Sequence, residues 1–317
     1  MGMTLVTGAS GFVGSHLIEE MTRRGLPVRG VTRGTTPGLM PIKSYGPEMV
    51  WSEYLAGVDQ VVHLAARVHV MKETASDPLS LFREANVTAT VNLARQAAQA
   101  GVRRFVFVSS IKVNGERTEP GKPFTSNEPP NPQDPYGISK AEAEAALVAL
   151  GRETGLEITI IRPPLVYGPG VRGNFRSLMK WAATGMPSIF AAVKNKRSFV
   201  HVATLCDLLI TVLDHPNAAH QVFLVSDGED LSTHELIERL TIDAGRQPKS
   251  IPVAPAILNL IGRVSRRRAA LERLTQSLQV DLSTTCQQLN WHPSNRFPPS
   301  DTFDRENRVW TQRATQS

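Results

Sequence analysis

Residues 5–14 read LVTGASGFVG, an apolar run followed by glycines at positions 8, 11 and 14. The apolar run predicts a buried strand, and the residues after it predict the start of a helix. Glycines at this spacing permit a tight turn, close approach of the backbone to a pyrophosphate, and close packing of the helix on the strand. We therefore expect a bound dinucleotide, contacted by Gly8, Gly11, Phe12, Val13 and Gly14.

Apolar runs and helical patterns alternate along most of the chain. Runs typical of strands buried on both faces occur at residues 4–7, 28–31, 61–65, 105–109, 158–161 and 222–225. Helical patterns lie between them at residues 14–24, 77–100 and 140–154. This alternation predicts an α/β fold with a doubly wound parallel sheet, the Rossmann arrangement.

The composition changes after Arg162, where prolines and glycines become frequent. Such residues are typical of loops, and here they predict a second, smaller lobe. We expect residues 1–162 to form a dinucleotide-binding domain, to which residues 199–226 return. Residues 163–198 and 227–317 would then form a substrate-binding lobe that is discontinuous in sequence.

Charge and composition exclude several classes of partner. The 317 residues carry a formal net charge of +6, which is compatible with nucleic acid, an anionic membrane or a phosphorylated small ligand. The basic residues are scattered, and the one tight cluster, Arg266 to Arg268, lacks interleaved aromatic residues. We therefore expect no nucleic-acid partner and favour the phosphorylated small ligand.

The cysteine content and the hydropathy of the sequence indicate the cellular compartment of the protein. Cys206 and Cys286 are the only cysteines, and their spacing fits neither a disulfide framework nor a zinc site. We expect no bound metal. The sequence also shows no signal-like segment and no run of 18 apolar residues. These features predict a cytoplasmic protein without stable membrane insertion.

The end of the second predicted strand bears on which cofactor is used. An acidic residue about twenty positions after the glycine motif would accept the ribose 2′-hydroxyl of NAD. This chain has Thr32 and Arg33 there, without an acid nearby. A hydroxyl and a guanidinium suit a 2′-phosphate, so the sequence favours NADP(H) and leaves NAD(H) possible.

Two segments supply candidate catalytic residues. Ser110 follows a predicted strand, at the edge where a parallel sheet opens onto its ligand. Tyr136 and Lys140 stand four residues apart on a predicted helix and so share a face. A positive charge about 4 Å from a phenol, at an effective dielectric of about 20, is worth roughly 4 kcal/mol, or about three pKa units. We therefore expect Lys140 to bring the pKa of Tyr136 close to neutrality.

The order of these motifs resembles the extended short-chain dehydrogenase/reductase family, and in particular its nucleotide-sugar epimerase, dehydratase and reductase branch. The resemblance rests on TGASGFVG, HLAA at 63–66, ANVTAT around Asn86, Ser110, Tyr136-x-x-x-Lys140 and RPPLVYGPG at 162–170, and it covers nearly the whole chain. It implies that Tyr136 is the acid/base, that Lys140 binds the nicotinamide ribose, and that Ser110 holds the reacting oxygen. It also implies that further residues border the cofactor or anchor the site: Leu64, Ala65, Ala66, Asn86 and Pro163.

The resemblance extends to the smaller lobe. GNF at 173–175 and RSFVHV at 197–202 resemble segments that hold the diphosphate of a nucleotide sugar, which implies that Asn174 and Arg197 contact the substrate. A guanidinium suits a pyrophosphate. His63 and His201 lie on apolar strands, and we interpret them as core histidines.

The chain also departs from the family pattern. Lys112 and Asn114 stand where many of the epimerases have a hydroxyl residue and a tyrosine, and Thr204 stands where an aspartate is usual. Together with the lean toward NADP(H), the first two departures favour reduction over epimerisation.

Three hypotheses for the function follow. The first is a reductase that transfers hydride to C4 of a UDP-4-keto-6-deoxy-N-acetylhexosamine for surface polysaccharide synthesis. The second is a UDP-sugar 4-epimerase with bound NAD, acting on UDP-glucose or UDP-N-acetylglucosamine. The third is a dinucleotide-sensing protein without catalysis, against which an intact Ser110, Tyr136 and Lys140 argue. The resemblance implies a homodimer that pairs helices near 77–100 and 140–154.

Overall fold

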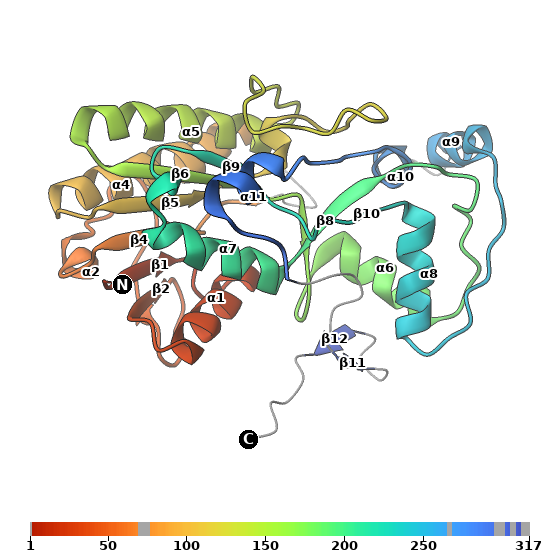
Figure 1. Cartoon of the computed structure of the whole chain (residues 1–317), viewed down its shortest axis with the longest axis horizontal. Helices are drawn as coiled ribbons and strands as arrows, with labels where there is room; N and C mark the ends of the chain where they lie inside the picture. The colour runs from red at the N-terminus through yellow and green to blue at the C-terminus, as the bar shows by residue number, and fades with distance from the viewer. Residues whose placement is uncertain (1, 69–76, 265–267, 295–301, 305–308, 312–317) are drawn as a thin grey trace.

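A seven-stranded parallel sheet forms the centre of the larger lobe in this computed structural model, which describes residues 2–68, 77–264, 268–294, 302–304 and 309–311 (Figure 1). The strand order is β3-β2-β1-β4-β5-β6-β9, and neighbouring strands are parallel. The strands are β1 (Thr4–Thr7), β2 (Val28–Thr32), β3 (Met40–Pro41), β4 (Gln60–His63), β5 (Arg104–Val108), β6 (Glu157–Arg162) and β9 (Val222–Leu224). The expected doubly wound α/β class is confirmed, and the strand order reverses beside β1.

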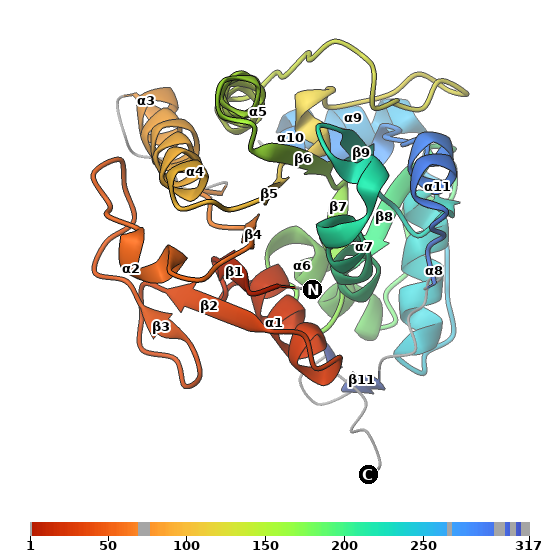
Figure 2. The same ribbon diagram turned by 60° about the vertical axis from the view of Figure 1, so that its left-hand side comes forward.

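Helices cover both faces of this sheet (Figure 2). One face carries α1 (Phe12–Arg23) with α7 (Val202–Asp214), and the other carries α4 (Ala89–Gln99) with α5 (Pro135–Thr154). Consecutive residues of β1 serve the two layers, since side chains alternate across a strand. Val6 belongs to the buried cluster with Leu17 and Leu209, whereas Leu5 belongs to the cluster with Leu93 and Leu147.

The single helix expected at residues 77–100 is interrupted. It consists of α3 (Pro78–Arg83), a π-helical turn η1 (Glu84–Thr88) and then α4. Asp77 caps the start of α3, where its carboxylate accepts a hydrogen bond from the Ser80 amide at 3.1 Å. The wider turn contains the buried Asn86, and such turns are frequent at functional sites.

The smaller lobe lies beside the sheet, at the right in Figure 1. Its three-stranded sheet has the order β10-β8-β7, with β7 (Leu165–Tyr167), β8 (Arg197–His201) and β10 (Asp230–Leu231). Its helices are α6 (Gly173–Ala183), α8 (Thr233–Asp243), α9 (Pro255–Val264) and α10 (Arg268–Thr275). The chain therefore returns to the larger lobe through α7 and β9, while β8 belongs to the small sheet. The division of the chain at residue 162 stays a prediction.

The remaining elements are short. They are α2 (Ser52–Leu55), the 3₁₀ turns η2 (Ile111–Val113) and η3 (Pro216–Ala218), α11 (Ser283–Leu289), and the antiparallel pair β11 (Thr302–Asp304) and β12 (Val309–Thr311). In the part of the chain that the structure describes, no helix has the length and apolarity needed to cross a membrane.

One extended segment, residues 276–281, joins the two lobes. On one side the Leu278 amide donates to the Lys196 carbonyl at 2.9 Å, and the Ser198 amide donates to the Leu278 carbonyl at 2.8 Å. On the other side the Phe124 amide donates to the Gln279 carbonyl at 2.8 Å. The segment is thus hydrogen-bonded both to β8 and to the loop that follows η2.

Candidate active site

The glycine turn after β1 leaves no room for side chains. Gly8 has a φ of +68°, and a Cβ there would lie 2.9 Å from the Ala65 amide nitrogen. A Cβ on Gly14 would lie 2.2 Å from the Gly8 carbonyl oxygen. The N-terminus of α1 has no side-chain cap, so its first amides can donate to a phosphate. This geometry fits the diphosphate of a dinucleotide.

The predicted cofactor residues on neighbouring strands meet this turn. Ala65, which follows β4, donates its amide to the Thr7 hydroxyl at 3.3 Å. The Thr32 hydroxyl at the end of β2 shares a hydrogen bond of 2.7 Å with Ser10 of the turn. Arg33 follows Thr32 and is exposed. The strand ends therefore surround the turn, with Arg33 on the solvent side.

Asn86 ties the loop after β4 to the helix that carries the predicted acid/base. Its carboxamide oxygen accepts from the Arg67 amide at 2.7 Å, and its Nδ2 donates to the Arg67 carbonyl and to the Ser139 hydroxyl, both at 3.0 Å. Asn86 is almost fully buried, at 1% exposure. This position is compatible with the predicted role of Asn86 in anchoring the active site. That role stays a prediction.

Ser110 and Tyr136 come together although 25 residues separate them along the chain. Ser110 begins the η2 turn after β5, and this turn is held against β6 because the Ile111 amide donates to the Pro163 carbonyl at 2.9 Å. Tyr136 lies in the first turn of α5. Ser110 lies close enough to the Tyr136 phenol to lower its pKa. This proximity is compatible with the reactive pair that the resemblance implies, which stays a prediction.

The environment of Tyr136 favours the protonated phenol. Burial raises its pKa to about 12, the negative charge of Asp134 adds to this effect, and the hydrogen bond with Ser110 opposes it. The ring also packs edge-on against Phe82 of α3, with the ring centroids 6.2 Å apart.

Lys140 does not lower the pKa of Tyr136 in this structure, so that expectation is wrong. The Lys140 ammonium lies over the Phe107 ring of β5, 4.1 Å from its centroid. Burial lowers the pKa of Lys140 itself to about 7. Burial thus disfavours the charged form of Lys140, which weakens its ability to offset the desolvation of the phenol.

Lys112 and Asn114, the two departures beside Ser110, both have polar partners. The Lys112 ammonium pairs with Glu116 at 2.8 Å and with Asp134. Asn114 is buried; its oxygen accepts from the Arg162 guanidinium, and its Nδ2 donates to the Thr125 carbonyl, both at 2.9 Å. Arg162 in turn forms a buried ion pair with Glu144 of α5 at 2.6 Å.

The predicted substrate residues lie in the smaller lobe. Asn174 is exposed in the first turn of α6. Arg197 begins β8 and donates to the Gln276 carbonyl at 2.9 Å. Burial lowers the pKa of Arg197 to about 10, a value that keeps the guanidinium charged at neutral pH. The two residues are on different elements, and their contact with a substrate stays a prediction.

The two histidines of the apolar strands are buried. His63 Nδ1 lies 2.7 Å from the Thr7 hydroxyl, and its Nε2 lies 2.9 Å from the Thr90 hydroxyl. Burial lowers the pKa of His63 to about 3. The amide of His201 donates to the Asp227 carboxylate at 2.9 Å. Both histidines are therefore buried residues at strand ends that hydrogen-bond neighbouring groups of the core.

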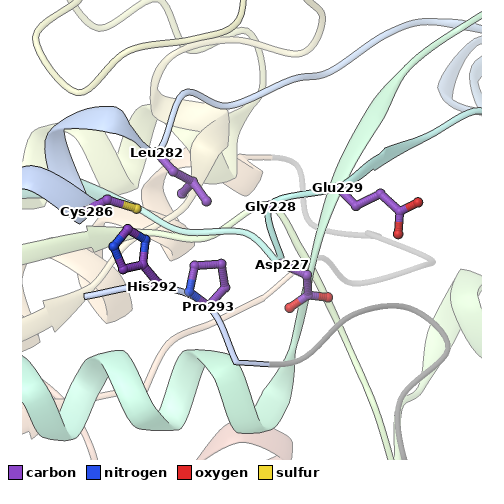
Figure 3. A pocket seen from close by; sticks show the side chains of 7 residues that line it. All are labelled: Asp227, Gly228, Glu229, Leu282, Cys286, His292 and Pro293. Atoms are coloured by element: carbon purple, nitrogen blue, oxygen red, sulfur yellow. The ribbon is translucent and has the colours of Figure 1, made fainter. Parts of the chain in front are cut away.

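Asp227 supplies a carboxylate near the position where the family pattern has an aspartate and this chain has Thr204. It accepts from the Tyr167 hydroxyl at 2.6 Å and hydrogen-bonds the Thr204 side chain. Asp227 also borders a hollow of about 580 Å³, with the lining residues Gly228, Glu229, Leu282, Cys286, His292 and Pro293 (Figure 3). The predicted catalytic residues do not line this hollow.

Sequence reasoning missed two acidic residues, Asp134 beside the predicted acid/base and Asp227 beside the hollow. Asp134 caps α5, and its carboxylate accepts from the Gly137 amide at 2.6 Å. The pair Asp134-Pro135 before a helical pattern is a recognisable start signal, so the sequence could have identified it. Asp227 carried no such signal, since its partners Tyr167 and His201 lie far away in sequence.

Comparison with protein families and curated proteins gives concordant results. Residues 4–226 match the NAD dependent epimerase/dehydratase family. The chain is 43% identical over 91% of its length to a UDP-glucose 4-epimerase of Vibrio cholerae, of which it covers 90%. It is 29% identical over 81% of its length to an N-acetyl-alpha-D-glucosaminyl-diphospho-ditrans,octacis-undecaprenol 4-epimerase of Escherichia coli O157:H7, with 77% of that protein covered.

Solved structures share the fold. MoeE5 in complex with UDP-glucuronic acid and NAD superimposes with a TM-score of 0.75 at 26% identity, covering 97% of this chain and 96% of that one. The UDP-glucose 4-epimerase of Thermotoga maritima with UDP-glucose gives a TM-score of 0.73 at 22% identity, covering 92% and 94%.

Proposed function

Since this chain belongs to the NAD dependent epimerase/dehydratase family, an extended short-chain dehydrogenase/reductase family of enzymes, we propose that it is a UDP-sugar 4-epimerase with bound NAD. The observation that carries the choice of reaction is the 43% identity to the Vibrio cholerae UDP-glucose 4-epimerase, which extends over 91% of the chain. Ser110 and the nearby Tyr136 phenol would supply the required chemistry.

In this proposal the residues act on the oxygen at C4 of the sugar. A bound NAD would supply the hydride acceptor for C4. Tyr136 acts once its phenol has ionised: it takes the proton from the 4-hydroxyl and later returns one, while Ser110 holds the same oxygen by a hydrogen bond. Arg197 and Asn174 bind the diphosphate, which keeps the nucleotide anchored while the sugar ring turns.

Reduction of a UDP-4-keto-6-deoxy-N-acetylhexosamine is the second candidate. The sequence favoured it because of Lys112 and Asn114. In the structure, however, Asn114 forms hydrogen bonds with Arg162 and Thr125. Lys112 forms ion pairs with Asp134 and Glu116. These partners give the two departures a structural explanation, so they lend reduction little support, and the curated relatives favour epimerisation.

One experiment separates the two candidates. The purified protein is incubated with UDP-glucose or UDP-N-acetylglucosamine, and the products are identified by NMR. Interconversion of C4 epimers without net consumption of added NADH or NADPH supports the proposal. If the protein leaves these sugars unchanged but consumes NADPH when given the 4-keto sugar, the reductase hypothesis replaces it.

We propose NAD as the cofactor in place of the NADP(H) that the sequence favoured. The Thr32 hydroxyl is engaged by Ser10, which reduces its availability for a 2′-phosphate, and the MoeE5 complexes contain NAD. Mass spectrometry of nucleotides released from the purified protein should identify NAD. If NADP is released instead, and if Arg33→Ala weakens NADPH binding more than NADH binding, the cofactor assignment is wrong.

We also propose a homodimer, which the family resemblance implies through α4 and α5. Light scattering at micromolar protein concentration should give twice the mass of 34.7 kDa. A monomeric mass under these conditions would reject the dimer without affecting the proposed reaction.

A further inference from the structure

Lys112 is linked to Ser110 and to Asp134, the N-cap residue of the helix that carries Tyr136. Its backbone amide donates to the Ser110 hydroxyl at 3.3 Å. Its ammonium pairs with Asp134, whose other carboxylate oxygen accepts from the Gly137 amide at 2.6 Å. The same residue therefore contacts Ser110 and the cap of the helix that carries Tyr136.

The backbone around this ion pair is closely packed. A Cβ on Gly137 would lie 3.0 Å from the Lys112 carbonyl oxygen and 3.1 Å from an Asp134 carboxylate oxygen. The start of α5 therefore rests against the η2 turn with little space between them. A change in the ion pair would be transmitted directly to the first turn of the helix.

The charge of Asp134 is the electrostatic link to Tyr136. Asp134 raises the pKa of the Tyr136 phenol, in the same direction as burial. Lys112 is about three-quarters buried, with 26% of its side chain exposed, and lies against that carboxylate. Its positive charge opposes the effect of Asp134 on the phenol.

Other charged groups lie near Tyr136 or near the pair of Lys112 with Asp134. The α5 segment contributes Asp134 and Lys140, and the η2 segment contributes Lys112 and Glu116. A further charged group is Arg67, whose guanidinium stacks on Phe82. Lys140 is turned toward the Phe107 ring and has lost much of its charge near neutral pH. Lys112 is therefore the cation that directly pairs with the acid beside the phenol.

We propose that Lys112 is a positioning residue of the epimerase: its ion pair with Asp134 holds the start of α5 against the turn that carries Ser110, and it neutralises the negative charge beside the Tyr136 phenol. This inference rests on the proposed function. It assigns a role to a residue that differs from the hydroxyl residue common in the family's epimerases.

The test compares Lys112→Met with two matched controls. Lys112→Arg keeps the charge, and Lys122→Met removes a lysine from an exposed ion pair in the same loop, where it contacts Glu119 at 2.7 Å. With NAD bound, Lys112→Met should move the acidic limb of the turnover profile upward by about one pH unit, the effect of one charge in a partly solvated site. Both controls should follow the wild-type profile.

Asp134→Asn supplies the opposite prediction and covers the case in which Lys112→Met fails to fold. Asparagine can still cap the helix, and loss of the negative charge should move the limb downward. The double variant Lys112→Met/Asp134→Asn should not show the upward shift of Lys112→Met. If Lys112→Met lowers turnover without moving the profile, or if the double variant keeps the full shift, the electrostatic role is rejected.

A readout without substrate separates this inference from the proposed reaction. The ultraviolet absorbance of tyrosinate is titrated with NAD present in each Lys112 and Asp134 variant, and the same variant carrying Tyr136→Phe is subtracted. The difference should titrate at higher pH in Lys112→Met and at lower pH in Asp134→Asn than in wild type. Unchanged midpoints would overturn the role of Lys112 even if epimerisation is observed, and shifted midpoints would support it even if epimerisation is not.

Discussion

Tyr136 is the side chain whose replacement tests the chemistry most directly. Tyr136→Phe keeps the ring packed against Phe82 and removes only the hydroxyl whose pKa Ser110 lowers. Turnover should fall by about 10²- to 10⁴-fold, the usual contribution of acid–base catalysis, while NAD affinity stays close to wild type. Tyr54→Phe, which loses only a bond to the Pro41 carbonyl, is the control in the same assay. A Tyr136→Phe variant with wild-type turnover would remove this residue from the mechanism.

His63 makes stability depend on pH. Burial lowers its pKa from 6.5 to about 3, so the unfolded chain binds a proton at pH values where the folded chain does not. As the pH falls from 6.5 toward 3, this residue should lower the free energy of unfolding by up to ~1.4 kcal/mol per pH unit. Urea unfolding of wild type and His63→Gln over this range should show the steeper loss in wild type. Parallel curves would contradict the assignment.

The residues of the site differ in how far the sequence could predict them. Gly8 and Gly14 follow from a local pattern, because the turn and the helix that need them are adjacent in sequence. The state of Lys140 does not follow, because its ammonium meets Phe107, a residue of another strand. Spacing along a helix shows which residues share a face, but it does not show what that face is buried against.

At the scale of elements, the β1–α1 turn should tolerate no added methyl group at its third glycine. A Cβ on Gly14 would lie 2.2 Å from the Gly8 carbonyl oxygen, so Gly14→Ala must displace the turn. We expect a loss of about 1–3 kcal/mol in unfolding free energy and weaker NAD binding. Gly46→Ala is the control, since a Cβ there meets no atom within 4 Å. Equal stability and equal NAD affinity of the two variants would refute the packing argument.

Two ion pairs of α5 should differ strongly in their importance. The pair of Glu144 with Arg162 is buried, with 6% and 5% of the side chains exposed, whereas the pair of Glu142 with Arg83 is exposed at the surface. Arg162→Met leaves a buried carboxylate without its partner and should cost about 3–5 kcal/mol. Arg83→Met should cost no more than about 1 kcal/mol. Chemical denaturation measures both, and similar losses would contradict this ranking.

Element boundaries were predictable where local signals were strong. The expected strand at residues 4–7 coincides with β1, and the expected helix at 140–154 lies within α5. The π turn that places Asn86 was not predictable, because the hydrophobic pattern continues across it into α4. A pattern of apolar residues gives the face of a helix but not a local widening of the turn.

For the whole molecule, the extended segment at 276–281 should make the two lobes unfold together. Its backbone bonds reach β8 on one side and the Phe124 loop on the other. Calorimetry of the protein should therefore show one transition, and UDP should raise its midpoint if the nucleotide binds between the lobes. Two separated transitions would show that this segment does not couple them.

The class of the sheet, parallel and doubly wound, was predictable from the alternation of strands and helices, whereas the short edge strand β3 was not expected. The assembly of the smaller lobe was not predictable. Its three strands pair β7 with β8 and β8 with β10, and Asp227 joins Tyr167 to the amide of His201 across that lobe. Such pairings depend on contacts between distant segments, which carry no local pattern.

The late position of the segment 276–281 has a consequence for synthesis on the ribosome. The loop that contains Phe124 is made early, yet its hydrogen-bonding partner Gln279 is made only after more than 150 further residues. The strands of the sheet up to β9 are made first, and the loop after Ser110 acquires its backbone bonds to the segment 276–281 only afterwards. A partly synthesised chain would thus already hold the glycine turn while the Phe124 loop still lacks its partner Gln279.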